Sequence, residues 1–99
     1  MATKSSNSPT PILIQQALHQ MGRRAHIVRK ARRMTQHDLA HLAGVGISTV
    51  ASLEGGHDGV ALGNLLKVLQ ALDLLDQAVG LFTLDDPALK EFAVRQLTP

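Results

Sequence analysis

A run of basic side chains in the first half of the chain is the first feature that could do chemistry. Six of the ten Lys and Arg residues lie between Arg23 and Arg33, a density that suits binding to a polyanion. The charge is polarised, because residues 1–50 hold seven Lys/Arg and one Asp, whereas residues 51–99 hold three Lys/Arg and seven acids. The same run also fits a solvated helix face, so other residues must decide between these interpretations.

Metal and catalytic chemistry find little support in the remaining polar residues. His37 and His41 stand four apart, a spacing that can place two ligands on one helix face, but no His-Glu-x-x-His string is present. Ser48 and Ser52 lie in no nucleophile elbow, and the 44–46 glycine turn lacks the pattern of a phosphate-binding loop. With 2% aromatic residues the chain offers no stacking platform for single-stranded nucleic acid. We therefore expect that the protein is not an enzyme and that it binds no metal and no cofactor.

The spacing of apolar residues predicts an all-α chain, with no strand-like alternation. In the first helix a stripe at spacings of three and four should face the core: Ile14, Leu18, Met21, Ala25 and Val28. Gly22 interrupts this helix, so one helix or two shorter ones are both open. Ile27 falls off the stripe. The predicted helices cover about 11–32, 36–43, 47–54, 62–72, 73–82 and, after the cap signal at 86–87, the C-terminal residues.

Two short helices joined by a glycine turn occupy the middle of the chain. Thr35 and Asp38 have the spacing of a capping box, and Gly44 is placed to end the helix in a left-handed conformation. The buried face of the first of these helices should comprise Leu39, Leu42 and Ala43. A following leucine stripe should also be core: Leu62, Leu65, Leu66, Leu69 and Leu72.

The string from Thr35 to Gly56, TQHDLAHLAGVGISTVASLEGG, resembles the helix-turn-helix of the XRE (Cro/CI repressor) family. The resemblance extends upstream through RRAHIVRKARRM and downstream through LLKVLQALDL, so it covers about residues 22–74. It implies a compact five- to six-helix, lambda-repressor-like DNA-binding domain. In such a domain the third helix enters the major groove of double-stranded DNA.

Helix geometry supports the same interpretation without the family. Packing of Leu39, Val45, Val50 and Leu53 onto a core, with Ala40 at the helix contact, would leave the outward positions of the third helix to Ile47, Ser48, Ala51 and Ser52. The helix start at Thr35 and Gln36 presents unpaired amides that suit a DNA phosphate. The resemblance assigns this phosphate contact to Gln36. It also implies a partly buried ion pair between Arg29 and Glu54, which would otherwise be two surface charges.

Three departures from the family pattern bear on how DNA is read. None of the recognition-helix candidates, which include Ile47, Ser48, Thr49 and Ser52, can make a two-pronged contact with guanine or adenine. Specificity should therefore lean on thymine methyls, DNA shape and dimer spacing. The loop after this helix, GGHDG, has no basic residue. Arg33 stands where a glycine is common, so a left-handed cap there should be strained.

The C-terminal segment carries more apolar residues than a small domain needs for its own core. We divide the chain into a disordered arm (1–10), the helix-turn-helix domain (11–83) and an amphipathic C-terminal helix (84–99). The surface of that helix comprises Leu89, Phe92, Ala93 and Leu97. It should form either a symmetric dimer interface or a surface for another protein. The ALDLLDQAVGLF run is similar to antitoxins encoded beside HipA-type kinases, and this resemblance implies a toxin partner.

The sequence therefore predicts a cytoplasmic, sequence-specific transcriptional repressor that binds a palindromic operator as a homodimer and autoregulates its operon. Arg32, Arg33 and Gln36 would grip phosphates, with Ser48 and Ser52 near base edges. The alternative is an antitoxin or interaction module that neutralises a HipA-type kinase, with DNA binding secondary. The chain has no cysteine and no apolar run of the roughly 20 residues that a membrane span requires. Residues 1–10 lack the apolar stretch of a secretory signal, so we expect a disordered arm there.

Overall fold

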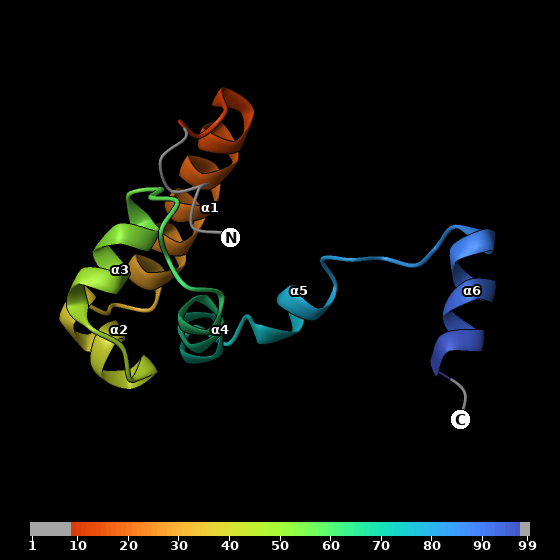
Figure 1. Cartoon of the computed structure of the whole chain (residues 1–99). Coiled ribbons are helices and arrows are strands. Elements are labelled where there is room, and N and C mark those ends of the chain that lie inside the picture. The colour runs from red at the N-terminus through yellow and green to blue at the C-terminus, as the bar shows by residue number, and fades with distance from the viewer. Residues whose placement is uncertain (1–8, 98–99) are drawn as a thin grey trace.

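The computed structural model describes residues 9–97, and within this range all regular secondary structure is helical (Figure 1). The bounds predicted for the two central helices are confirmed. No helix in residues 9–97 is long and apolar enough to cross a membrane. The six helices are α1 (Ile12–Ala31), α2 (Gln36–Ala43), α3 (Ile47–Glu54), α4 (Leu62–Ala71), α5 (Leu75–Val79) and α6 (Pro87–Leu97).

The core lies where α2, α3 and α4 meet against the second half of α1. Its four fully buried large side chains are Leu39, Val50, Val68 and Leu72. Ala25, Ala40 and Leu53 complete it, and Val45 packs against it. Burial of each large aliphatic side chain contributes about 1.5–3 kcal/mol. This small core holds the α2–α3 pair on the scaffold, as predicted from Leu39, Val50 and Leu53.

Two leucines predicted to be buried are exposed. Leu42 is 62% exposed because the buried arc of α2 runs through Leu39, Ala40 and Ala43, and Leu42 lies on the other side of Leu39. Leu62 is 68% exposed because it is the first residue of α4, one and a half turns before Val68, which meets the core. The other members of the leucine stripe are half-buried or buried.

The first helix is continuous through Gly22, which settles the alternative left open by the sequence. Gly22 is buried, and a Cβ built on it would lie 2.4 Å from the carbonyl oxygen of Leu53. The glycine therefore allows the backbone at the end of α3 to approach α1. The predicted stripe is buried only in the second half of α1, since Ile14 and Met21 are 51% and 43% exposed.

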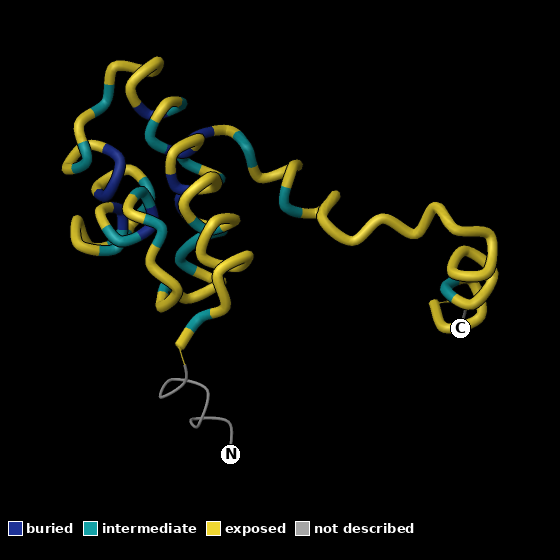
Figure 2. Tube along the Cα trace, turned by 90° about the horizontal axis from the view of Figure 1, so that it is seen from above, coloured by how far each residue is buried: buried dark blue, intermediate teal, exposed yellow. Residues whose placement is uncertain are grey.

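The C-terminal helix stands apart from the others. α5 is shorter than predicted, because the turn before it places Asp73 at a φ of 62° and Gly80 ends it. An extended segment then leads to α6, whose start is capped by Asp86: its carboxylate accepts from the amide of Ala88 at 2.8 Å. Figures 1 and 2 show α6 away from the packed helices, with every residue exposed except the half-buried Ala93. The packed helices thus run from α1 to α5, and α6 lies apart from them.

Candidate nucleic-acid interface

The start of α2 has the geometry that the capping box predicted. The hydroxyl of Thr35 accepts from the amide of Asp38 at 3.0 Å, and the Asp38 carboxylate accepts from the amide of Thr35 at 2.9 Å. The hydrogen bonds from the Thr35 amide and hydroxyl hold the pKa of Asp38 below its ordinary value. At the other end, Gly44 caps α2 with a φ of 72°, the left-handed conformation that glycine favours.

The turn presents one side of α3 to solvent. Ile47, Ser48 and Ala51 are exposed, whereas Thr49 and Ser52 are half-buried. Ile47 is the largest apolar residue of this surface, at 50% exposed. The structure therefore brings the first three together as an outward face and leaves Thr49 and Ser52 at its margins. This exposed face offers one hydroxyl and two apolar side chains.

Basic residues adjoin the start of α2. Arg32 caps the end of α1 and Arg33 follows it, and both side chains are exposed. Arg33 has a φ of 60°, so the left-handed cap predicted at this position is confirmed. A left-handed backbone costs a non-glycine residue roughly 1–2 kcal/mol. Arg33 therefore places a positive charge at a position where glycine would be less strained but would carry no charge.

A buried ion pair joins α1 to the end of α3. The Arg29 Nε atom donates to Glu54 Oε2 at 2.6 Å and Nη2 donates to Oε1 at 3.0 Å, with the two side chains 7% and 5% exposed. Arg29 Nη1 also donates to the carbonyl oxygen of Met34 at 2.7 Å. Arg29 and Glu54 are therefore not two separate surface charges, the alternative that the sequence left open. The pair fixes the C-terminal end of α3 to α1 and to the turn that follows α1.

Two further side chains complete the cluster around Glu54. His26 Nδ1 lies 2.9 Å from Glu54 Oε1, and Gln36 Nε2 donates to the same oxygen at 3.1 Å. Burial would raise the pKa of Glu54, but the hydrogen bonds from Arg29, His26 and Gln36 outweigh it and lower that pKa. The Glu54 carboxylate in turn raises the pKa of Arg29. Arg29 and Glu54 are therefore both held in their charged forms.

The sequence did not predict the contact of His26 with Glu54. It predicted a phosphate contact for Gln36 but not its hydrogen bond to Glu54. His26 precedes Arg29 by three residues, a helical spacing that places both on one side of α1 and could have indicated the contact. No local signal links Gln36 to Glu54, because they meet only when α2 packs on α3. The amide NH₂ of Gln36 is directed to Glu54, so one of its ends is already engaged.

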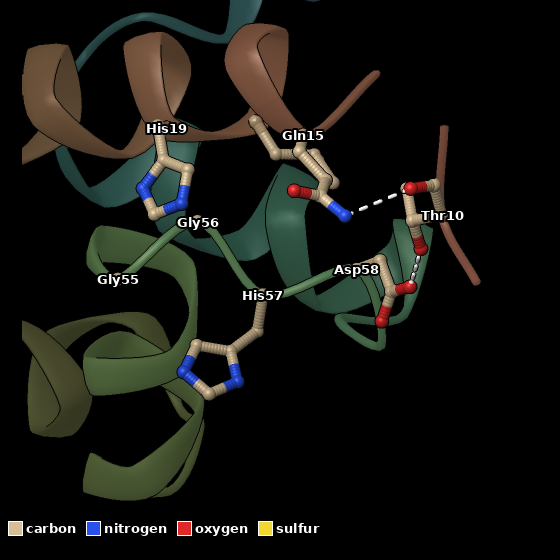
Figure 3. A pocket seen from close by; sticks show the side chains of 8 residues that line it. Thr10, Gln15, His19, Gly55, Gly56, His57 and Asp58 are labelled. Carbon is tan, nitrogen blue, oxygen red and sulfur yellow. Dashed lines mark hydrogen bonds between the residues drawn. The ribbon is translucent and has the colours of Figure 1, made fainter. Parts of the chain in front are cut away.

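The loop after α3 is tied to the start of α1. The Thr10 hydroxyl donates to the Asp58 carboxylate, and Gln15 Nε2 donates to the Thr10 carbonyl oxygen at 2.8 Å (Figure 3). Gly56, at a φ of 75°, lies against His19. Thr10, which we assigned to a disordered arm, thus holds this loop, while residues 1–8 of that arm lie outside the described residues. A shallow hollow opens here.

The remaining predicted positions are separate from this surface. Leu89, Phe92, Ala93 and Leu97 all lie on α6, away from α3 (Figure 1). Among residues 9–97, no three His, Asp or Glu side chains are grouped so that they could hold a metal ion. The candidate DNA-contacting residues therefore lie on α2 and α3 and among the basic residues beside them.

Comparisons with known proteins agree with the geometry. A helix-turn-helix family model matches residues 26–75. The chain is also similar to an uncharacterized HTH-type transcriptional regulator, y4mF, of Sinorhizobium fredii, with 40% identity over 52 residues, which are 52% of this chain and 68% of that protein. No solved structure matches the chain. The resemblance drawn from the Thr35–Gly56 string is confirmed, and it points to a regulator that is not an enzyme. The chain belongs to the XRE-type helix-turn-helix family of DNA-binding transcriptional regulators.

Proposed function

We propose that the protein is a homodimeric repressor that inserts α3 into the major groove of a palindromic operator and regulates its own operon. The observation that carries this proposal is the buried Arg29–Glu54 pair, which fixes α3 while its other side stays exposed. Burying two charges is costly unless both are paired and hydrogen-bonded, as they are here. A recognition helix held in this way is oriented before it meets DNA.

Phosphate contacts would position the protein, and the α3 surface would read bases. Arg32 and Arg33 lie beside the α2 start. The Thr35 amide already donates to Asp38, so the backbone amide of Gln36 would contact the phosphate. Ile47 and Ala51 would contact thymine methyls, with hydroxyls from Ser48, Thr49 and Ser52 near base edges or phosphates. This readout is limited, so the spacing of two half-sites and DNA shape would add the missing specificity.

A dimer would supply that spacing. Two recognition helices reach successive major grooves of one DNA face when their half-sites lie about 10 base pairs apart. The apolar surface of α6, comprising Leu89, Phe92, Ala93 and Leu97, is the candidate for the dimer contact.

An electrophoretic mobility shift on the DNA upstream of the gene tests the proposal. We expect wild-type protein to shift this DNA cooperatively in the presence of random competitor and to repress a reporter fused to it. Arg32→Glu should weaken binding at least tenfold. It should also make the fall of log K with log salt less steep by about 0.9, the contribution of one phosphate contact.

Lys67→Glu is the matched control for this substitution. Lys67 is exposed on α4 and undergoes the same charge reversal, so it should leave binding and repression unchanged. Equal losses in both variants would mean that only net charge matters. Binding of operator and random DNA with the same affinity would refute a sequence-specific repressor.

The antitoxin hypothesis stays a prediction. The exposed apolar residues of α6 could also contact a HipA-type kinase. Co-purification of a kinase encoded beside this gene, retained by Arg32→Glu and lost on substitution of Phe92, would support that function. A wild-type protein that does not bind the neighbouring gene's product would refute it.

A further inference from the structure

Two exposed apolar faces occur at opposite ends of the described chain. The first, the donor face, is formed by Leu89, Phe92, Ala93 and Leu97 of α6; Phe92 and Leu97 are 61% and 81% exposed. The second, the acceptor stripe, is formed by Ile14, Ala17 and Met21 in the first half of α1, all exposed. Exposed apolar faces of this kind mark contact sites.

The acceptor stripe lies on a different side of α1 from the one that contacts α3. Successive residues of a helix are turned by about 100°, so Met21 lies about 100° around α1 from Gly22, whose side contacts α3. His26 and Arg29 meet Glu54 from that same α3 side. A helix packed on the acceptor stripe would therefore leave α3 open to DNA.

The two faces match in length and shape. Leu89 to Leu97 spans about 12 Å along a helix and Ile14 to Met21 about 10.5 Å, at 1.5 Å per residue. In an antiparallel arrangement Leu89 lies opposite Met21 and Leu97 opposite Ile14. The small side chains of Ala93 and Ala17 then face one another in the middle and allow the helices to approach closely.

The charges that precede α6 suit contact with α1. Helix α1 holds four Lys/Arg and no acid, and Arg23, Arg24 and Lys30 are exposed. Asp85 and Asp86 directly precede α6. In the antiparallel arrangement the acids at 85–86, which precede α6, lie near Arg24, one turn beyond Met21.

We propose that α6 of each copy packs on the acceptor stripe of a second copy, in a reciprocal exchange that forms the dimer. This inference rests on the homodimer of the proposed function and names its contact. The extended segment before α6 carries the helix away from its own domain (Figure 1). Reciprocal exchange closes a two-fold dimer and makes the same contact twice.

Disulfide trapping tests the exchange directly, because the chain contains no cysteine. Ala17→Cys and Ala93→Cys each replace one small residue by another and keep every large apolar side chain. Mixed in equal amounts and oxidised, the two variants should give a covalent heterodimer of about twice 10.6 kDa. Mixtures of Lys67→Cys with Ala93→Cys give the background rate of random collision.

Each other result overturns the exchange. Ala93→Cys alone forming a covalent dimer above background would show α6 packed on α6. The double variant Ala17→Cys/Ala93→Cys yielding an internally cross-linked monomer would show α6 packed on its own α1. No cross-link above background would mean that the faces do not meet.

Mass measurement in solution gives an independent reading without DNA. Met21→Asp, with its helicity checked by circular dichroism, should convert the dimer to a monomer, whereas Gln20→Asp beside the stripe should not. A Met21→Asp variant that stays dimeric refutes the exchange. A wild-type protein that is dimeric and cross-links as expected, yet binds no operator, would refute the repressor and leave the exchange standing.

Discussion

Gly22→Ala tests whether the close approach of α1 and α3 is required. In an isolated helix alanine is favoured over glycine by about 0.5–1 kcal/mol. Here the added Cβ would lie 2.4 Å from the Leu53 carbonyl oxygen and 2.7 Å from that of Glu54. The first distance is about 1 Å short of the 3.4 Å at which ordinary contact begins, and both atoms belong to the backbone.

The substitution must therefore separate α1 from the end of α3. Overpacking of this kind costs about 1–3 kcal/mol, which exceeds the helix gain, so we expect a net loss of about 1 kcal/mol. For a domain of this size each kcal/mol lowers Tm by roughly 4–8 °C. The movement would also disturb the pair between Arg29 and Glu54, because Glu54 ends α3.

Urea unfolding at fixed protein concentration measures the effect, with Gly63→Ala as the matched control. Gly63 lies near the start of α4, and a Cβ there would meet nothing within 4 Å. The control should therefore be as stable as wild type or more stable, by up to about 1 kcal/mol. If Gly22→Ala is stabilised as much as Gly63→Ala, the two helices do not pack as closely as described and the reasoning is wrong.

Three further predictions concern the charged residues. Arg29→Met should destabilise the fold by about 3–5 kcal/mol in urea unfolding, because Glu54 is left buried without its partner. The double variant Arg29→Met/Glu54→Leu should recover most of this loss. If it does not, the unpaired Glu54 carboxylate is not the cause of the destabilisation. Arg33→Gly should stabilise the fold by about 1 kcal/mol and weaken operator binding in a mobility shift, whereas Asp73→Gly, also at positive φ, should stabilise it without affecting binding; unchanged binding in Arg33→Gly would remove Arg33 from the interface. The lowered pKa of Glu54 means that its stabilising contribution is complete above its ordinary pKa of 4.5 and is lost as pH falls below that value. The urea midpoint of the wild-type protein should therefore fall between pH 5 and pH 3, and that of Glu54→Gln should fall less. An equal fall in both proteins would mean that Glu54 is not the source of the pH dependence.

Local signals in the sequence determined the helix-turn-helix. The bounds of α2 and α3, the capping box at Thr35, the left-handed turn at Gly44 and the strained Arg33 each depend on a few neighbouring residues, whose steric and hydrogen-bonding preferences act before any tertiary contact. The family string added the pair between Arg29 and Glu54, which no local pattern contains.

Tertiary packing decided what the periodicity could not. An apolar stripe shows which side of a helix can be buried, but the arc and length that are buried depend on where another helix meets it. For this reason Leu42, Leu62 and Met21 are exposed despite their favourable spacing. For the same reason Gln36 meets Glu54, and Gly22 serves as a contact between helices: both depend on the distance between elements far apart in the sequence.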